Sequence, residues 1–135
     1  MNPALLKSVM IVDDEKSYTG LLTQLLAENL DCPVVSYSRP RAALAALRQL
    51  DVGMIITDYD MPELNGFEFM AEVAKLDPEI PYILITGHPL EAVVDKLAGA
   101  VPPRVILPKP FTWRRLGDEI IRHWPGPSLA LLRNA

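Results

Sequence analysis

Residues 54–66 read MIITDYDMPELNG. They open with a short apolar run, Met54 to Ile56, that lacks apolar/polar alternation and is rich in β-branched side chains. Strands covered by helices on both faces read this way, as parallel strands do. The run leads into Asp58, and the Asn65-Gly66 pair then marks a turn before a stretch of helical period. The pattern predicts a buried strand that ends in an acid and is followed by a helix.

The same pattern recurs along the chain. Four further apolar runs are Val9 to Val12, Pro33 to Tyr37, Tyr82 to Ile85 and Val105 to Leu107. Apolar stripes of helical period follow the five runs: Leu21, Leu22, Leu25 and Leu26; Ala43, Leu44, Leu47 and Leu50; Phe67, Met70, Ala71 and Ala74; Val93, Val94 and Leu97; Trp113, Leu116, Ile120 and Trp124. Strand alternating with helix predicts an α/β fold: a five-stranded parallel sheet in the order 2-1-3-4-5, with helices on both faces.

Several helix ends can be predicted from single residues. Ser38 is the expected N-cap of the second helix, with Pro40 in its first turn. Gly99 is expected to end the fourth helix, whereas Thr112 is expected to cap the fifth and Pro125 to stop it.

Composition limits the classes of function. Of 135 residues, 50% are hydrophobic and 22% are charged, which fits one packed domain. We expect this domain to span residues 1–124 and residues 125–135 to be a short C-terminal tail or a truncated linker. The formal net charge is −4 and there is no long basic run, which argues against nucleic-acid binding through this domain.

The chain also lacks the patterns of exported, membrane and zinc proteins. Cys32 is the single cysteine, so it has no internal disulfide partner, and no Cys/His cluster suggests zinc. No secretory signal precedes the domain, and no apolar run approaches the roughly 18 residues that cross a bilayer. We therefore expect a cytoplasmic protein that does not engage the membrane.

Reactive side chains stand where the predicted strands end. The first strand runs into Asp13-Asp14-Glu15, the third into Asp58, the fourth into Thr86-Gly87 and the fifth into Lys109. In open α/β sheets, ligands bind outside the carboxyl ends of the strands, where the strand order reverses. With the predicted order, acids, a hydroxyl and an amine converge on that edge.

This combination suits phosphoryl transfer. Carboxylates packed together repel each other unless a cation lies between them, and Mg²⁺ prefers carboxylate, water and phosphate oxygens. A carboxylate can then act as a nucleophile towards phosphorus and become an aspartyl phosphate. Magnesium and Lys109 would neutralise the moving group, and the Thr86 hydroxyl would donate a hydrogen bond to it.

Four segments together resemble the receiver domains of bacterial response regulators, including the chemotaxis regulator, over about residues 7 to 124. They are IVDDE (11–15), TDYDMPELNGFEF (57–69), LITGH (84–88) and LPKPF (107–111). The resemblance implies a flavodoxin-like receiver fold and a role in a two-component system or phosphorelay. It also implies that Asp58 is phosphorylated by a sensor histidine kinase or a histidine phosphotransfer domain.

The resemblance further assigns roles to matching positions. Asp14 matches the direct magnesium ligand, Asp13 the acid that acts through water, and the backbone carbonyl of Asp60 a third protein ligand beside Asp58. Thr86 matches the switch hydroxyl, and Lys109 the amine whose bond to Pro110 is typically cis.

The sequence departs from the family pattern in three respects. Ile106 stands where an aromatic ring usually turns inward on activation, so that rotation is not the output step here. The stretch GAVPPRVILPK (99–109) is about three residues longer than usual, on a surface that many relatives use to form homodimers. Asp60 and His88 lie two positions past Asp58 and Thr86, and we hypothesise that they tune the lifetime of the phosphoryl group.

Other interpretations stay open. The Asp58-Tyr59-Asp60 motif also occurs in phosphatases of the haloacid-dehalogenase type, but their further acidic pair follows the lysine, whereas here the pair opens the chain. A degenerate pseudo-receiver that acts as a scaffold is a second alternative. Thr86 could simply cap the fourth helix, and His88 could be an exposed or capping residue. The downstream partner and any output domain are not specified by the sequence.

Overall fold

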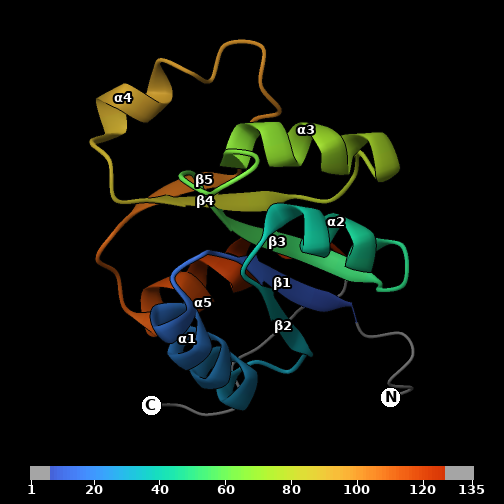
Figure 1. Ribbon diagram of the computed structural model, residues 1–135. Coiled ribbons are helices and arrows are strands. Elements are labelled where there is room, and N and C mark those ends of the chain that lie inside the picture. The colour runs from blue at the N-terminus through green and yellow to red at the C-terminus, as the bar shows by residue number, and fades with distance from the viewer. Residues whose placement is uncertain (1–6, 127–135) are drawn as a thin grey trace.

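In the computed structural model, which describes residues 7–126, five strands alternate with five helices (Figure 1). The elements are β1 (Ser8–Val12), α1 (Lys16–Asn29), β2 (Val34–Tyr37), α2 (Pro40–Leu47), β3 (Val52–Asp58), α3 (Gly66–Leu76), β4 (Tyr82–Thr86), α4 (Leu90–Val94), β5 (Val105–Pro108) and α5 (Trp113–His123). The predicted alternation of strand and helix is confirmed.

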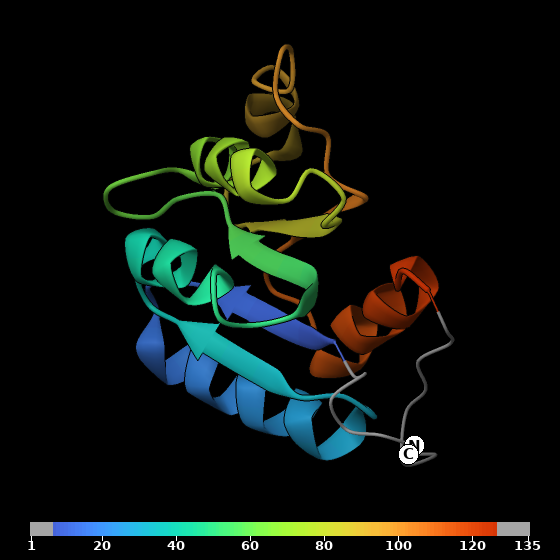
Figure 2. The ribbon, with the colours of Figure 1, turned by 90° about the vertical axis from the view of Figure 1, so that its right-hand side faces the viewer.

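The five strands form one parallel sheet in the order β2-β1-β3-β4-β5. The predicted order is therefore confirmed. Helices α1 and α5 cover one face of the sheet, and α2 and α3 cover the other (Figures 1 and 2). From β1 the chain adds β2 on one side, and from β3 onward it adds β4 and β5 on the other side. The strand order therefore reverses between β1 and β3.

Two apolar cores fill the space on either side of the sheet. In β1, Val9 and Ile11 belong to the core under α1 and α5, whereas Met10 and Val12 belong to the core under α2 and α3. Successive side chains of a strand point to opposite faces, so a strand buried on both faces has no solvent-facing positions. All five residues of β1 and all seven of β3 are buried, which explains the continuous apolar runs in the sequence.

The boundaries of α2 and α3 correct two details. The prediction that Ser38 caps α2 is wrong: Arg39 is the N-cap, without a side-chain hydrogen bond, and Pro40 supplies the fixed φ of the first turn. On α3 the predicted Ala71 is exposed, because the apolar stripe runs instead through residues that face the sheet: Phe67, Phe69, Met70 and Val73.

Helix α4 is shorter than predicted. It ends at Val94, although Gly99 does adopt the left-handed conformation, with φ 78°. Only Val93 of the helix is buried, and Val94 is 49% exposed. A five-residue helix with one buried side chain has little tertiary packing to extend it, which explains its early end.

Helix α5 lies as predicted from Thr112, whose side chain accepts a hydrogen bond from the Arg115 amide, to His123. The next residue, Trp124, lies over the amino end of β3: a Cβ on Gly53 would come within 2.7 Å of the indole ring. The amino end of β3 is thus closely packed. Among the described helices, none is long and apolar enough to cross a membrane. Residues 127–135 of the predicted tail lie outside the described part of the chain.

Candidate functional site

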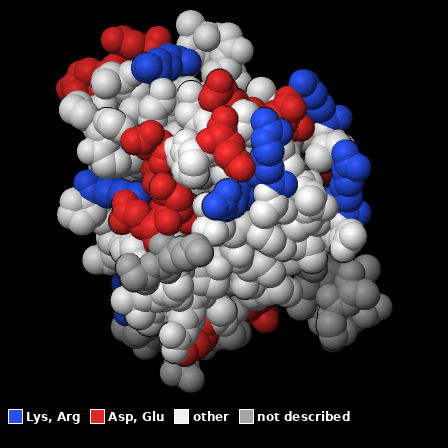
Figure 3. Space-filling model, viewed as in Figure 1, with Lys and Arg blue, Asp and Glu red and all other residues white. Residues whose placement is uncertain are grey.

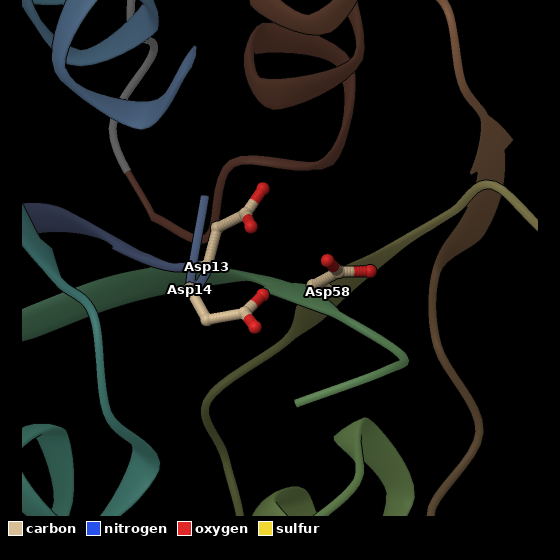
Figure 4. A group of neighbouring side chains, drawn as sticks. All are labelled: Asp13, Asp14 and Asp58. Atoms are coloured by element: carbon tan, nitrogen blue, oxygen red, sulfur yellow. The ribbon is translucent and has the colours of Figure 1, made fainter. Parts of the chain in front are cut away.

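Three carboxylates converge at the carboxyl ends of β1 and β3. Asp13 and Asp14 follow β1, and Asp58 is the last residue of β3 (Figure 4). Each of the three can offer one oxygen, and these oxygens lie within 4.8 Å of one another. Asp13 and Asp58 are buried, whereas Asp14 is exposed. The convergence predicted from the strand order is therefore present.

Lys109 supplies a positive charge to this group of acids. Its Nζ lies 3.0 Å from Asp58 Oδ2, 3.4 Å from Asp13 Oδ2 and 3.6 Å from Glu15 Oε1. Lys109 follows β5 directly, and its backbone N–H donates to the carbonyl of Thr86 at the end of β4. The peptide bond between Lys109 and Pro110 is cis, as the resemblance implied.

Burial and charge shift two pKa values in the site. Burial raises the pKa of Asp58 from 3.8 to about 6; the hydrogen bond from Lys109 opposes this shift, and the charge of Asp13 adds to it. Burial alone would lower the pKa of Lys109, but its hydrogen bond and charge contact with Asp58, together with Asp13, raise it. Lys109 therefore stays an ammonium, whereas for Asp58 the effect of burial outweighs that of the Lys109 charge.

Thr86 is fully buried at the end of β4, beside the acids along the sheet edge. Its hydroxyl oxygen accepts a hydrogen bond from the His88 backbone N–H at 3.0 Å. The alternative that Thr86 caps α4 is wrong, because Pro89 is the N-cap of that helix and makes no side-chain cap bond.

Asp60 and His88 meet at the rim of the site. His88 Nε2 lies 3.3 Å from Asp60 Oδ2, and the His88 ring stands edge-on to the Tyr59 ring at 6.0 Å. Asp60 also donates its backbone N–H to Asp58 Oδ1 at 3.4 Å. Its side chain is thus directed to His88 and is not one of the three grouped acids.

The acids border an open cavity of about 260 Å³, lined by Asp14, Glu15, Asp58, Asp60, Gly87, His88 and Lys109. A cavity of this size admits a phosphoryl group with its waters. In Figure 3 acidic side chains gather on the part of the surface that lies towards α1 and α4. The site is therefore shallow, acidic and open to a partner.

Gly66 fixes the loop that follows Asp58. A Cβ at this position would lie 2.7 Å from the Asp58 carbonyl oxygen and 2.7 Å from Leu84 Cδ1. The Gly66 N–H donates to the Tyr59 carbonyl, and α3 starts there with a capping box between Asn65 and Glu68. The close approach of two backbones explains the glycine in the NG pair.

The sequence reasoning missed two contacts of Lys109. These are the contacts with Glu15 and with Tyr18, neither of which the sequence pattern assigned to Lys109. The Tyr18 ring centroid lies 5.8 Å from Lys109 Nζ, and the ring packs edge-on against Phe111. The Phe111 that follows the Lys-Pro pair was the available signal for an aromatic partner on α1.

The chain matches the response regulator receiver domain family over residues 9–121. It is 26% identical to the response regulator receiver protein CpdR of Brucella abortus, over 85% of this chain and 94% of that protein. It is 36% identical to the transcriptional regulatory protein FixJ of Rhizobium meliloti, over 77% of this chain and 50% of that protein. A CheY-like receiver domain from Methanospirillum hungatei superimposes with a TM-score of 0.72 at 26% identity, covering 85% of this chain and 90% of that one.

These findings define a receiver domain of the two-component type. The chain belongs to the response regulator receiver family, whose general function is to accept a phosphoryl group. It spans only part of some curated relatives: 17% of the C4-dicarboxylate transport transcriptional regulatory protein DctD of Rhizobium meliloti, and 23% of a protein-glutamate methylesterase/protein-glutamine glutaminase of Agrobacterium fabrum.

Proposed function

We propose that Asp58 is the phosphoacceptor of this receiver and that a phosphohistidine on a sensor kinase or a phosphotransfer domain is the donor. The observation that carries the proposal is the Asp58 carboxylate itself. It is buried, it lies 3.0 Å from the Lys109 ammonium, and it shares the end of the sheet with Asp13 and Asp14. Its neighbours Gly87 and His88 leave an open approach from solvent.

The transfer needs little covalent chemistry from the protein. A carboxylate oxygen of Asp58 bonds to phosphorus, the P–N bond to the donor imidazole breaks, and that imidazole leaves with the bonding electron pair. Lys109 offsets the charge on the phosphoryl oxygens, since it is already held between Asp58 and Asp13. We assign to Thr86 a hydrogen bond to the attached phosphoryl group, for which its hydroxyl proton is free to rotate.

The acids fit a magnesium ion. Three carboxylates that offer oxygens within 4.8 Å of one another form an all-oxygen donor set suited to a hard cation. A further positive charge beside Asp58 would lower its raised pKa and favour the ionised carboxylate. We assign Asp14, Asp58 and the Asp60 carbonyl as ligands, with Asp13 acting through water; bound magnesium would neutralise charge on the phosphoryl oxygens.

Downstream of phosphorylation we propose a change in protein–protein contacts made by residues 1–124, with catalysis limited to the domain's own phosphorylation and dephosphorylation. We include a homodimer among the proposed forms of this cytoplasmic regulator. The half-buried side chain at the usual aromatic position is Ile106, so the output does not use a rotating ring.

The decisive experiment uses the full chain with Mg²⁺ and phosphoramidate, followed by intact-protein mass measurement. We expect one added phosphoryl group that requires magnesium and that is absent from the Asp58→Asn variant. No adduct, under conditions where a known receiver reacts, would contradict the proposal and favour the scaffold alternative. Steady release of phosphate from several phosphomonoesters without a lasting adduct would contradict it in favour of a phosphatase.

A further inference from the structure

An open groove of about 560 Å³ lies between α2 and α3, away from the phosphoryl site. We call it the α2–α3 groove. Its apolar lining comes from Leu44 and Ala45 of α2 and Leu76 of α3, and its basic lining comes from Arg41, Arg48 and Lys75. Figure 3 shows basic side chains, with acidic ones beside them, over the two helices labelled in Figure 1.

The lining residues follow the spacing of helix faces. On α2 they stand at positions 41, 44 and 45, with Arg48 at its C-cap, and on α3 at positions 72, 75 and 76. Residues three, four and seven apart share one face of a helix. The groove is therefore bounded by single faces of two adjacent helices, and this is the form that accepts a third helix, ridge into groove.

The charge of the groove opposes that of the chain. The chain carries a formal charge of −4, whereas the groove is lined by three basic residues and one acid, Glu72. Glu72 pairs with Lys75 at 2.6 Å. Within residues 7–126, the side chains of Arg41 and Arg48 make no ion pair within 4.0 Å. The charge of Arg41 does act on Glu72, whose pKa it helps Lys75 to lower, so the groove keeps an excess of positive charge.

The apolar part of the groove is accessible. Leu76 is 47% exposed, and Leu44 is half-buried. A partner can bury Leu76 and place acids beside Arg41 and Arg48, neither of which makes an ion pair within the described chain.

From these observations we infer that the α2–α3 groove docks an acidic amphipathic helix of a partner protein. The apolar face of that helix would cover Leu44 and Leu76, and carboxylates beside that face would meet Arg41 and Arg48. Among the described residues a second copy offers no such helix: α4 has only five residues, and the exposed Leu21 of α1 has one acid, Glu28, on its side. The inference is independent of the proposed phosphorylation, because no site residue lines the groove.

A selection from displayed helical peptides tests the inference without knowledge of the natural partner. A library of 16-residue sequences would be selected against the full wild-type chain and depleted on the Arg41→Glu/Arg48→Glu variant. We expect enriched peptides to carry apolar residues three and four apart flanked by Asp or Glu. Synthetic peptides should bind in fluorescence anisotropy at least tenfold more weakly to the double variant and more weakly in high salt.

The matched control is the Lys96→Glu/Arg104→Glu variant, which makes the same change in charge on exposed positions outside the groove. We expect it to bind like the wild type, and circular dichroism should show both variants folded. Three results would overturn the inference: selection without enrichment of acids, equal binding to the groove variant, or an equal loss in the control. A concentration-dependent dimer in sedimentation that the groove variant abolishes would assign the groove to a second copy instead.

Discussion

The two ends of β3 have opposite characters. At the carboxyl end, Asp58 lies buried beside another buried acid, and burial raises its pKa to about 6. At the amino end, the Trp124 ring lies against Gly53 so closely that a Cβ there would be 2.7 Å from it. One end of a single strand therefore keeps charge that is costly to bury, and the other end is packed with an aromatic ring. Stability and reactivity are separated along the strand rather than shared.

The first test of this comparison is the effect of Asp58→Asn on the free energy of unfolding in magnesium-free buffer. The pKa of Asp58 in the folded chain lies above its ordinary value of 3.8, so the folded chain holds this proton more tightly than the unfolded chain. The free energy of unfolding should therefore fall as pH rises from about 4 to 6. At pH 7 the variant should be more stable by about 1 to 3 kcal/mol.

Urea unfolding of both proteins at several pH values would measure this difference. The gain of the variant should shrink towards pH 4, where Asp58 is protonated in the folded wild type. Magnesium should stabilise the wild type and not the variant, by roughly 2.7 kcal/mol at a hundred times the dissociation constant. If the free energies of unfolding of the two proteins changed with pH in the same way, Asp58 would carry no buried charge in the folded chain.

An effect of similar size and opposite sign is expected at the other end of the strand. Gly53→Ala should lower the free energy of unfolding by about 1 to 3 kcal/mol, because the added methyl group overpacks the Trp124 ring. Phosphorylation of Asp58 should be retained. Gly20→Ala in α1 is the matched control: nothing lies within 4 Å of its Cβ position, and alanine is the better helix former.

Thermal unfolding would compare the two substitutions, with the Gly20 variant expected slightly above the wild type. If Gly53→Ala were neutral, the indole ring would not be packed as the structure shows. If Gly53→Ala abolished phosphorylation while the fold persisted, packing at the amino end of β3 and reactivity at its carboxyl end would not be independent.

The smallest effect is expected at the rim of the site. Asp60 and His88 form a contact of 3.3 Å at the rim of the site, and we hypothesise that this pair tunes the lifetime of the phosphoryl group. Asp60→Asn and His88→Ala should each change the decay rate of phosphorylated protein several-fold. The double variant should change it by less than the product of the two, since both act through one contact.

Decay would be followed by mass measurement after removal of the phosphoryl donor. Glu91→Gln, an exposed acid on α4 outside the lining of the site, is a suitable control. Unchanged decay in both single variants would refute the tuning hypothesis.

The sequence predicted the sheet and the position of the acids because both follow from local patterns. Runs such as Val9 to Val12 are continuous since each strand is buried on both faces, and parallel strands bring their carboxyl ends together. The predicted N-cap of α2 and the predicted end of α4 were wrong, because helix ends depend on tertiary contacts as well as on single residues. Spacing along the chain likewise gave no sign that Tyr18 lies near Lys109 or that Arg41 shares a groove with Leu76.

Gly66 has a consequence for protein engineering. Its hydrogen occupies the only room between the Asp58 carbonyl and the Leu84 side chain, so every larger residue at position 66 would push on the backbone of Asp58 itself. A combinatorial library that randomises the loop between β3 and α3 should therefore hold this one position constant. Diversity placed at the exposed Pro62 or Glu63 changes the surface beside the site, whereas diversity at Gly66 mostly yields chains with a displaced Asp58.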